Sequence, residues 1–326
     1  MVRNGAARQC VVVSTLAMLA ASAAAVAGEP PGTVEPAPTV TGSAGLFRLS
    51  TTEVGDPRRL HLALFGELSH ASDFLVFGDI NTKVAGDVAA WLAVHRHVQL
   101  FAAVRASWNR NDVNGTPASE PSVSTIGSGG FSVGAKAATA IGRAGGAGVE
   151  IGARLPFAAG SWPDSGAAWI DGLASLDLTA LTPIPLRLHG SGGFYADGSR
   201  NQIDFAGQSA AAREVAQFAH GMGSSRVRIA FGLDAPLERW TGRLGLRPFA
   251  EYHYELITAD PDPALSDQTP YYTDQVWVTA GLRARAGAGV TLIAGVDVGA
   301  ASVGFPYGPP LAPWNAFAGA SRVLAF

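Results

Sequence analysis

Charged side chains recur in this chain at alternate positions of short stretches that are otherwise apolar. In RVRIAFGLD, Arg226, Arg228 and Asp234 alternate with Val227, Ile229 and other apolar residues. A period of two places side chains on one face of a β-strand. Such a face presents a wall of fixed charge, which can form ion pairs within itself or act on charged solutes that move along it.

The charged residues that we single out as candidates for lining an enclosed space are these: Arg105, Lys136, Arg187, Arg226, Arg228, Arg243, Arg247, Glu251, Arg283, Arg285 and Asp297. Two interpretations are open. The residues can form a structural network of ion pairs that fills the space, or they can line a pore that selects solutes. In a pore, the arginines between residues 226 and 285 would favour anions.

Histidine and serine also occur on these polar faces, but their spacing does not predict catalysis. Ser191 follows His189 by two residues on one predicted strand, so the two side chains point the same way about 7 Å apart, too far for a direct hydrogen bond. We therefore predict no catalytic residue and no enzyme. A membrane-embedded enzyme that acts on lipids is kept as the alternative.

No metal or cofactor site is predicted either. The stretch 257–274 is rich in aspartate but lacks a recognisable spacing of calcium ligands. The glycines of GRAGGAG, from Gly142 on, do not follow a phosphate-loop pattern and indicate a tight turn.

The first 27 residues have the pattern of an export signal. Arg3 and Arg8 precede an apolar core, and small residues end at Ala27, where we expect cleavage. The chain has one cysteine, Cys10, inside this segment, so the mature protein is expected to have no disulfide or cysteine metal site. Of 23 basic and 26 acidic residues, the signal holds two arginines and no acid, which leaves 21 against 26 and a mature net charge near −5. This charge gives no footprint for nucleic acid.

The elements that must position the charged residues are predicted to be strands. Residues 28–58 contain many Pro, Gly and Thr residues and indicate a periplasmic linker or extended arm. From residue 59 to 326 the period-2 pattern predicts about twelve strands of roughly 9–13 residues, a length that suits a tilted membrane strand. The connections alternate between long and short, and the long ones include 109–128, 196–224 and 257–274.

This combination resembles bacterial outer-membrane β-barrels, the porin-like and OmpA-type transmembrane barrels of Gram-negative bacteria. The resemblance rests on the export signal, the alternating strands, the alternating connections and the terminal Phe326. It implies an all-β fold, a transmembrane antiparallel up-and-down β-barrel of about twelve strands over 59–326. It also implies that Phe326 and Leu324 form the signal that the barrel assembly machinery reads. Arg322 interrupts the apolar alternation of this last stretch, either by snorkelling to the interface or through a local slip of register.

The resemblance further implies an exported protein of the cell outer membrane, in contact with outer-membrane lipids. We expect a monomer that acts as a passive porin-like channel for small solutes, with a preference for anions, or as a structural surface barrel. Eight strands enclose a space that side chains fill, whereas sixteen to eighteen leave an aqueous channel. About twelve strands therefore predict a narrow or a plugged lumen. A secreted soluble β-protein is the least favoured alternative.

Overall fold

The computed structural model describes residues 36–72, 79–113, 123–155, 166–198, 225–258, 275–287, 289–301 and 311–326. The export signal and residues 28–35 lie outside the described residues. Twelve long strands dominate these ranges: β3 (Arg59–Ser72), β4 (Asp79–His95), β5 (Val98–Val113), β6 (Val123–Ile141), β7 (Gly145–Leu155), β8 (Ala167–Asp177), β9 (Arg187–Asp197), β10 (Arg226–Asp234), β11 (Arg247–Ile257), β12 (Gln275–Gly287), β13 (Val290–Ala301) and β14 (Trp314–Ala325).

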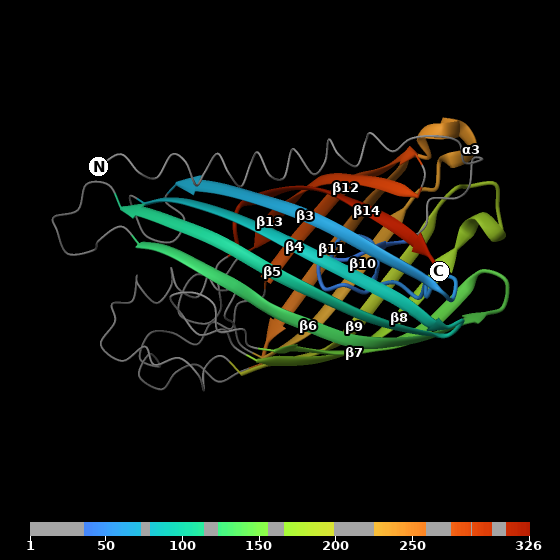
Figure 1. Cartoon of the computed structure of the whole chain (residues 1–326), viewed down its shortest axis with the longest axis horizontal. Coiled ribbons are helices and arrows are strands. Elements are labelled where there is room, and N and C mark those ends of the chain that lie inside the picture. The colour runs from blue at the N-terminus through green and yellow to red at the C-terminus, as the bar shows by residue number, and fades with distance from the viewer. Residues whose placement is uncertain are drawn as a thin grey trace.

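The twelve strands form one closed barrel in which each strand pairs with its neighbours in the sequence (Figure 1). All of these pairs are antiparallel, and β14 closes the barrel on β3 with Leu324 opposite Leu60. The predicted fold class, an antiparallel up-and-down β-barrel of about twelve strands, is confirmed. Closure leaves no unpaired sheet edge, which a barrel in hydrocarbon requires.

Several connections differ in length from the prediction. Residues 109–111 and 123–128, expected within a long connection, continue the ladder between β5 and β6, and residues 112 and 113 extend the pairing of β5 with β4. At the opposite end, two connections expected to be short contain helical turns: η1 (Leu178–Ala180) after β8, and α3 (Glu238–Thr241) with η3 (Gly242–Leu244) after β10. Backbone pairing needs no apolar side chain, so the polar ends of strands extend further than their hydrophobic pattern does. The two longest connections, 198–225 and 258–274, still lie at the same end of the barrel.

The outward face of the barrel is apolar. Large aliphatic and aromatic side chains are exposed there on nearly every strand, with Val88 at 56%, Ile151 at 52% and Phe231 at 59% of their full exposure. The alternate positions point inward and carry the charged residues, such as Asp87 and Lys136, each 1% exposed. An apolar exterior around a polar interior is the arrangement of a barrel whose solvent outside is lipid. None of the described helices is long and apolar enough to cross a membrane.

Arg322 keeps its place on the outward face of β14. Ser321 is buried while Arg322 and Leu324 are exposed, so the alternation is unbroken at this position. The pairing of β14 with β13 and with β3 shows no register shift. Of the two explanations for Arg322, a slip of register is therefore wrong.

Candidate functional site: the occupied lumen

Residues 36–57, which precede β3, lie inside the barrel, and we call them the lumen segment. In Figure 1 they form the blue trace enclosed by the strands, in the half of the barrel that carries α3. A short antiparallel pair, β1 (Ala37–Pro38) with β2 (Ala44–Gly45), folds the segment back on itself. The sequence predicted a linker or extended arm over 28–58. The described part of that stretch is packed against the wall, with Ala44 and Phe47 fully buried.

Two glycines let the lumen segment approach the wall closely. Gly42 has a φ of +104°, and a Cβ there would lie 2.5 Å from the carbonyl oxygen of Ala102 in β5. Gly55 has a φ of +80°, and a Cβ there would lie 2.3 Å from the ring of Trp91 in β4. Any other residue would combine a left-handed backbone with a steric clash, so glycine is required at both positions.

Wall side chains bind the backbone of the segment as much as its side chains. The Lys136 ammonium donates to the carbonyls of Ala44 and Thr51, over 2.8 and 3.0 Å. The amide of Gln99 accepts from the Ala44 N–H over 3.0 Å and donates to the carbonyl of Val54 over 3.2 Å. Lys136 and Gln99 are 1% and 0% exposed, so the segment supplies the polar partners that their burial requires.

Two further wall residues hold the central turn of the segment from the other side of the lumen. The Arg283 guanidinium, on β12, donates to the carbonyl of Gly45 over 2.6 Å and to that of Leu46. The Glu251 carboxylate, on β11, accepts from the N–H groups of Phe47 and Arg48, over 2.6 and 3.1 Å. The backbone of residues 44–48 is therefore bound by a cation and an anion at successive peptide units.

An apolar cluster fixes the same turn. Phe47 stacks on Phe317 of β14, with ring centroids 3.6 Å apart, and meets the edge of Phe65 of β3 at 5.6 Å. Leu46 and Leu49 are buried in the same cluster. Offset-stacked and edge-to-face aromatic contacts add to the free energy of burying the rings.

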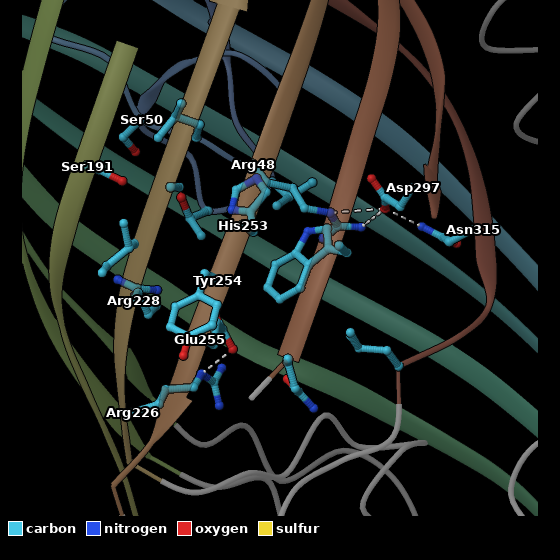
Figure 2. A pocket seen from close by; sticks show the side chains of 18 of the residues that line it. Arg48, Ser50, Ser191, Arg226, Arg228, His253, Tyr254, Glu255, Asp297 and Asn315 are labelled. Carbon is cyan, nitrogen blue, oxygen red and sulfur yellow. Dashed lines mark hydrogen bonds and ion pairs between the residues drawn. The ribbon is translucent and has the colours of Figure 1, made fainter. Parts of the chain in front are cut away.

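Arg48 connects the segment to two carboxylates on opposite sides of the strand closure. Its guanidinium lies 2.8 Å from Glu67 of β3 and 2.5 Å from Asp297 of β13. Asp297 also accepts from Asn315, as Figure 2 shows. Burial alone would lower the pKa of Arg48, but the charges of Asp297 and Glu67 raise it above its usual value. Arg48 therefore stays positively charged in the lumen.

Glu53 anchors the end of the segment that leads into β3. Its carboxylate lies 2.5 Å from the guanidinium of Arg187 on β9. Burial alone would raise the pKa of Glu53, but the positive charges of Arg187 and Arg247 lower it to about 2. Glu53 is consequently ionised over the whole ordinary pH range.

A cavity of about 380 Å³ lies beside the segment, toward the barrel end with the long connections. Val40, Arg48 and Ser50 of the segment border it, and Trp169 and Trp277 contribute aromatic surface from the wall. Its charged lining comprises the cations Arg48, Lys83, Arg105, Arg226 and Arg228 and the anions Glu67, Glu150, Asp171, Glu255 and Asp297. The two signs are therefore present in equal number.

Most of the other predicted wall residues form ion pairs with residues one or two strands away. Arg105 pairs with Glu67 and Asp87, Arg226 with Glu255, and Arg228 with Asp171. Arg187 and Arg247 both approach Asp234, at 3.3 and 3.5 Å, and Arg247 also pairs with Glu238 of α3. Arg285 lies on β12 and is half-buried. The arrangement brings the arginines of β10, β11 and β12 to one wall, together with the acids that oppose them.

Arg243 does not lie on a strand, so its prediction as a strand residue is wrong. It lies in η3, within the connection that precedes β11, and β11 begins at Arg247. Gly242 and Gly245 flank it with φ of +55° and +49°. These left-handed residues turn the chain, so the alternating pattern of RLGLR does not continue a strand.

A Ser-His-Asp series lies in the part of the wall that faces the lumen segment, and the sequence did not reveal it. The Ser175 hydroxyl lies 2.9 Å from Nδ1 of His189, whose Nε2 lies 2.8 Å from the Asp234 carboxylate. Ser175 is directly opposite His189 on the neighbouring strand, whereas Ser191 is on the same strand. The Thr52 N–H donates to the Ser175 oxygen over 3.4 Å, and β8 pairs with a neighbouring strand on each side, so the backbone around Ser175 takes part in the ladders of the barrel.

The remaining candidates concern metal binding and assembly. The described residues contain no group of three or more His, Cys, Asp or Glu residues that could hold a metal ion. Leu324 faces outward opposite Leu60, and Phe326 follows β14 with its N–H donating to the carbonyl of Arg58 over 3.3 Å. Phe326 is 74% exposed.

Comparisons with known proteins show where this fold occurs. No protein-family model matches the chain, and no curated protein matches its sequence. Among solved structures, an outer-membrane channel from Pseudomonas putida F1 aligns with 84% of this chain and 98% of its own, at 9% identity and a TM-score of 0.54. The translocator domain of the autotransporter NalP from Neisseria meningitidis aligns with 83% of this chain and 89% of its own, at 12% identity and a TM-score of 0.44. The monoaromatic hydrocarbon channel CymD aligns with 90% and 98%, at 10% identity and a TM-score of 0.43. At 9% identity, the similarity to the Pseudomonas putida channel shows a shared fold.

Proposed function

We propose that this chain, which has the fold of bacterial outer-membrane β-barrels, is an outer-membrane channel for small solutes that its own lumen segment closes. The observation that carries the proposal is the position of residues 36–57. They fill the half of the lumen opposite the long connections, while a cavity of about 380 Å³ remains in the other half. A barrel of twelve strands is wide enough to enclose such a segment and narrow enough to be closed by it.

The charges of the lumen bear on selectivity. In the cavity, cations and anions are equal in number and largely paired, which favours small polar solutes of either charge. We propose the anion preference expected from the sequence only for the half of the lumen that the segment occupies. There, Lys136 and Arg283 hydrogen-bond to carbonyls of the segment, and these two cations become available to anions when the segment leaves.

A reversible covalent lock tests control by the segment. Thr52 Cβ lies 3.1 Å from the position that a Cβ would take on Gly146 of β7, close to the roughly 3.5–4.5 Å of a disulfide. The double variant Thr52→Cys/Gly146→Cys, in a mature chain with no other cysteine, should form that disulfide. Oxidised protein in a planar bilayer should show only the closed level, and a reductant should restore the openings of the unmodified protein.

Single-cysteine variants, Thr52→Cys and Gly146→Cys, are the matched controls and should not respond to oxidant. Current through the double variant that oxidation does not change would contradict control by the segment. Absence of current from both the reduced double variant and a Phe47→Ala variant would contradict a channel and favour a structural surface barrel.

We also propose that the role is not enzymatic. The Ser175, His189 and Asp234 series lies beneath the lumen segment, and Asp234 is bound by two arginines, Arg187 and Arg247. Such bonds suit a structural network. A fluorophosphonate probe should therefore fail to label Ser175, and labelling that disappears in Ser175→Ala would reinstate the lipid-acting alternative.

A further inference from the structure

We propose that the wall of the lumen is a binding site for a peptide that folds back on itself, and that it binds a separate peptide with the sequence of residues 36–57 once the chain's own segment is displaced. This inference deepens the proposed function, because such a peptide would close the channel in trans. The binding itself does not depend on conductance.

The wall recognises polypeptide backbone. Lys136, Gln99, Arg283 and Glu251 come from four strands, β6, β5, β12 and β11, and all four are at most 2% exposed. The hydrogen bonds of Lys136 and Arg283 within the described residues are to carbonyls of the segment and not to carboxylates. A buried cation without a partner is strongly unfavourable, so these positions are built for an occupant that carries carbonyl groups.

The wall also distinguishes side chains. Phe317 and Phe65 form an aromatic site for Phe47, whereas Glu67 and Asp297 form an anionic site for the adjacent Arg48. Arg187 forms a cationic site for Glu53, six residues beyond Phe47. The site therefore selects a peptide with an apolar, an aromatic and a basic residue in succession, as in Leu46 to Arg48. An acidic residue must follow at the spacing of Glu53.

The segment contacts the inner wall of the barrel in the way that a bound ligand would, and it does not join the barrel sheet as a strand. Its β1 and β2 pair with each other, and the ladders from β3 to β14 close without either of them. Backbone continuity at β3 gives the segment a high effective concentration, on the order of millimolar for a short linker. A separate peptide can therefore enter only when the resident segment is weakened.

The experiment uses the full chain carrying Phe47→Ala and Arg48→Ala, which we call the loosened variant. A synthetic peptide of residues 36–57 with a fluorophore at its N-terminus is titrated with this protein in detergent, and binding is followed by anisotropy. In a planar bilayer the same unlabelled peptide should reduce the current of the loosened variant. A peptide with Phe47→Ala and Arg48→Ala should bind at least about tenfold more weakly, because it lacks the stacked ring and a charge-assisted pair.

A wall variant separates specific binding from adsorption to detergent or lipid. Adding Lys136→Met to the loosened variant should weaken peptide binding by about tenfold or more, since it removes two charge-assisted hydrogen bonds. Adding Arg322→Gln, on the outward face, should leave binding unchanged. Heat-modifiable migration on gels verifies that each variant is folded.

The outcomes distinguish this inference from the proposed function. Saturable peptide binding that is weakened by Lys136→Met supports the inference, even if the protein conducts no current. The missing current would then contradict only the proposed channel function. A loosened variant that conducts but binds neither peptide overturns the inference and leaves the channel standing. Equal binding of both peptides also overturns it.

Discussion

Phe47 of the lumen segment stacks on Phe317 of β14, with ring centroids 3.6 Å apart and planes inclined by 7°. This contact joins the segment to the strand that closes the barrel on β3. Phe47 is fully buried, so its removal leaves a cavity in the centre of the cluster that holds the segment.

Phe47→Ala is expected to raise the open probability of the proposed channel. A buried Phe→Ala change costs about 3–5 kcal/mol, so the closed state should lose at least about a hundredfold in its equilibrium with the open one. Single-channel recording in a planar bilayer measures this. Phe231→Ala, on the outward face, is the control, and an effect of equal size from both variants would contradict the role of Phe47.

Arg48→Met is expected to shift selectivity toward cations. The change removes a positive charge from the cavity border while Glu67 and Asp297 remain, so the lining becomes anionic on balance. The reversal potential across a salt gradient should move in the cation-selective direction, and the shift should shrink at high salt. An unchanged reversal potential at low salt would show that this site lies off the ion path.

Glu53 is expected to make the proposed closure of the channel weaken in acid but not near neutral pH. Its pKa is about 2 in place and about 4.5 when free, so the bound segment favours the ionised form. For a lowered pKa, the stabilisation is fully present above the free value and is lost as pH falls through about 4.5 toward 2. The contribution of Glu53 to the open probability should therefore stay constant from pH 8 to 5, and the open probability should rise below about pH 4.5.

Glu53→Gln should remove that acid response and raise open probability already at neutral pH. The variant keeps the size of the side chain but lacks the charge that Arg187 binds. A Glu53→Gln protein whose openings still increase between pH 4.5 and 2.5 as much as those of the unmodified protein would assign the response to another group.

Deletion of Phe326 is expected to impair insertion. Phe326 follows the strand that closes the barrel, and the resemblance to outer-membrane barrels places the assembly signal there. The amount of heat-modifiable protein in outer-membrane fractions should fall more than in Asp262→Asn, a change in the predicted connection 257–274. Equal amounts of the two variants would argue against this role for Phe326.

The connections 198–225 and 258–274 are expected to face the cell exterior. They join strands at the same end of the barrel, opposite the ends of β3 and β14 that carry Arg59 and Ala325. Protease treatment of intact cells should cleave within these two ranges. Cleavage limited to 178–186 and 235–246, at the opposite end, would reverse the orientation.

The barrel itself was predictable from the sequence because its cause is local. A strand between lipid and an enclosed lumen must alternate apolar and polar residues, and this alternation is visible at Val227, Arg228 and Ile229 without knowledge of any partner. The number of alternating stretches gave the number of strands. Where a local pattern was broken by turn geometry, as at Arg243 between Gly242 and Gly245, the prediction was wrong.

The occupant of the lumen was decided by tertiary structure. Residues 36–57 carry no periodic pattern, and their partners Glu67, Lys136, Arg187, Glu251 and Arg283 are spread over most of the chain. Register across neighbouring strands likewise places Ser175 beside His189, although fourteen positions separate them in the chain. Period and composition report which face a residue occupies, whereas contacts across a closed barrel depend on how all the strands align together.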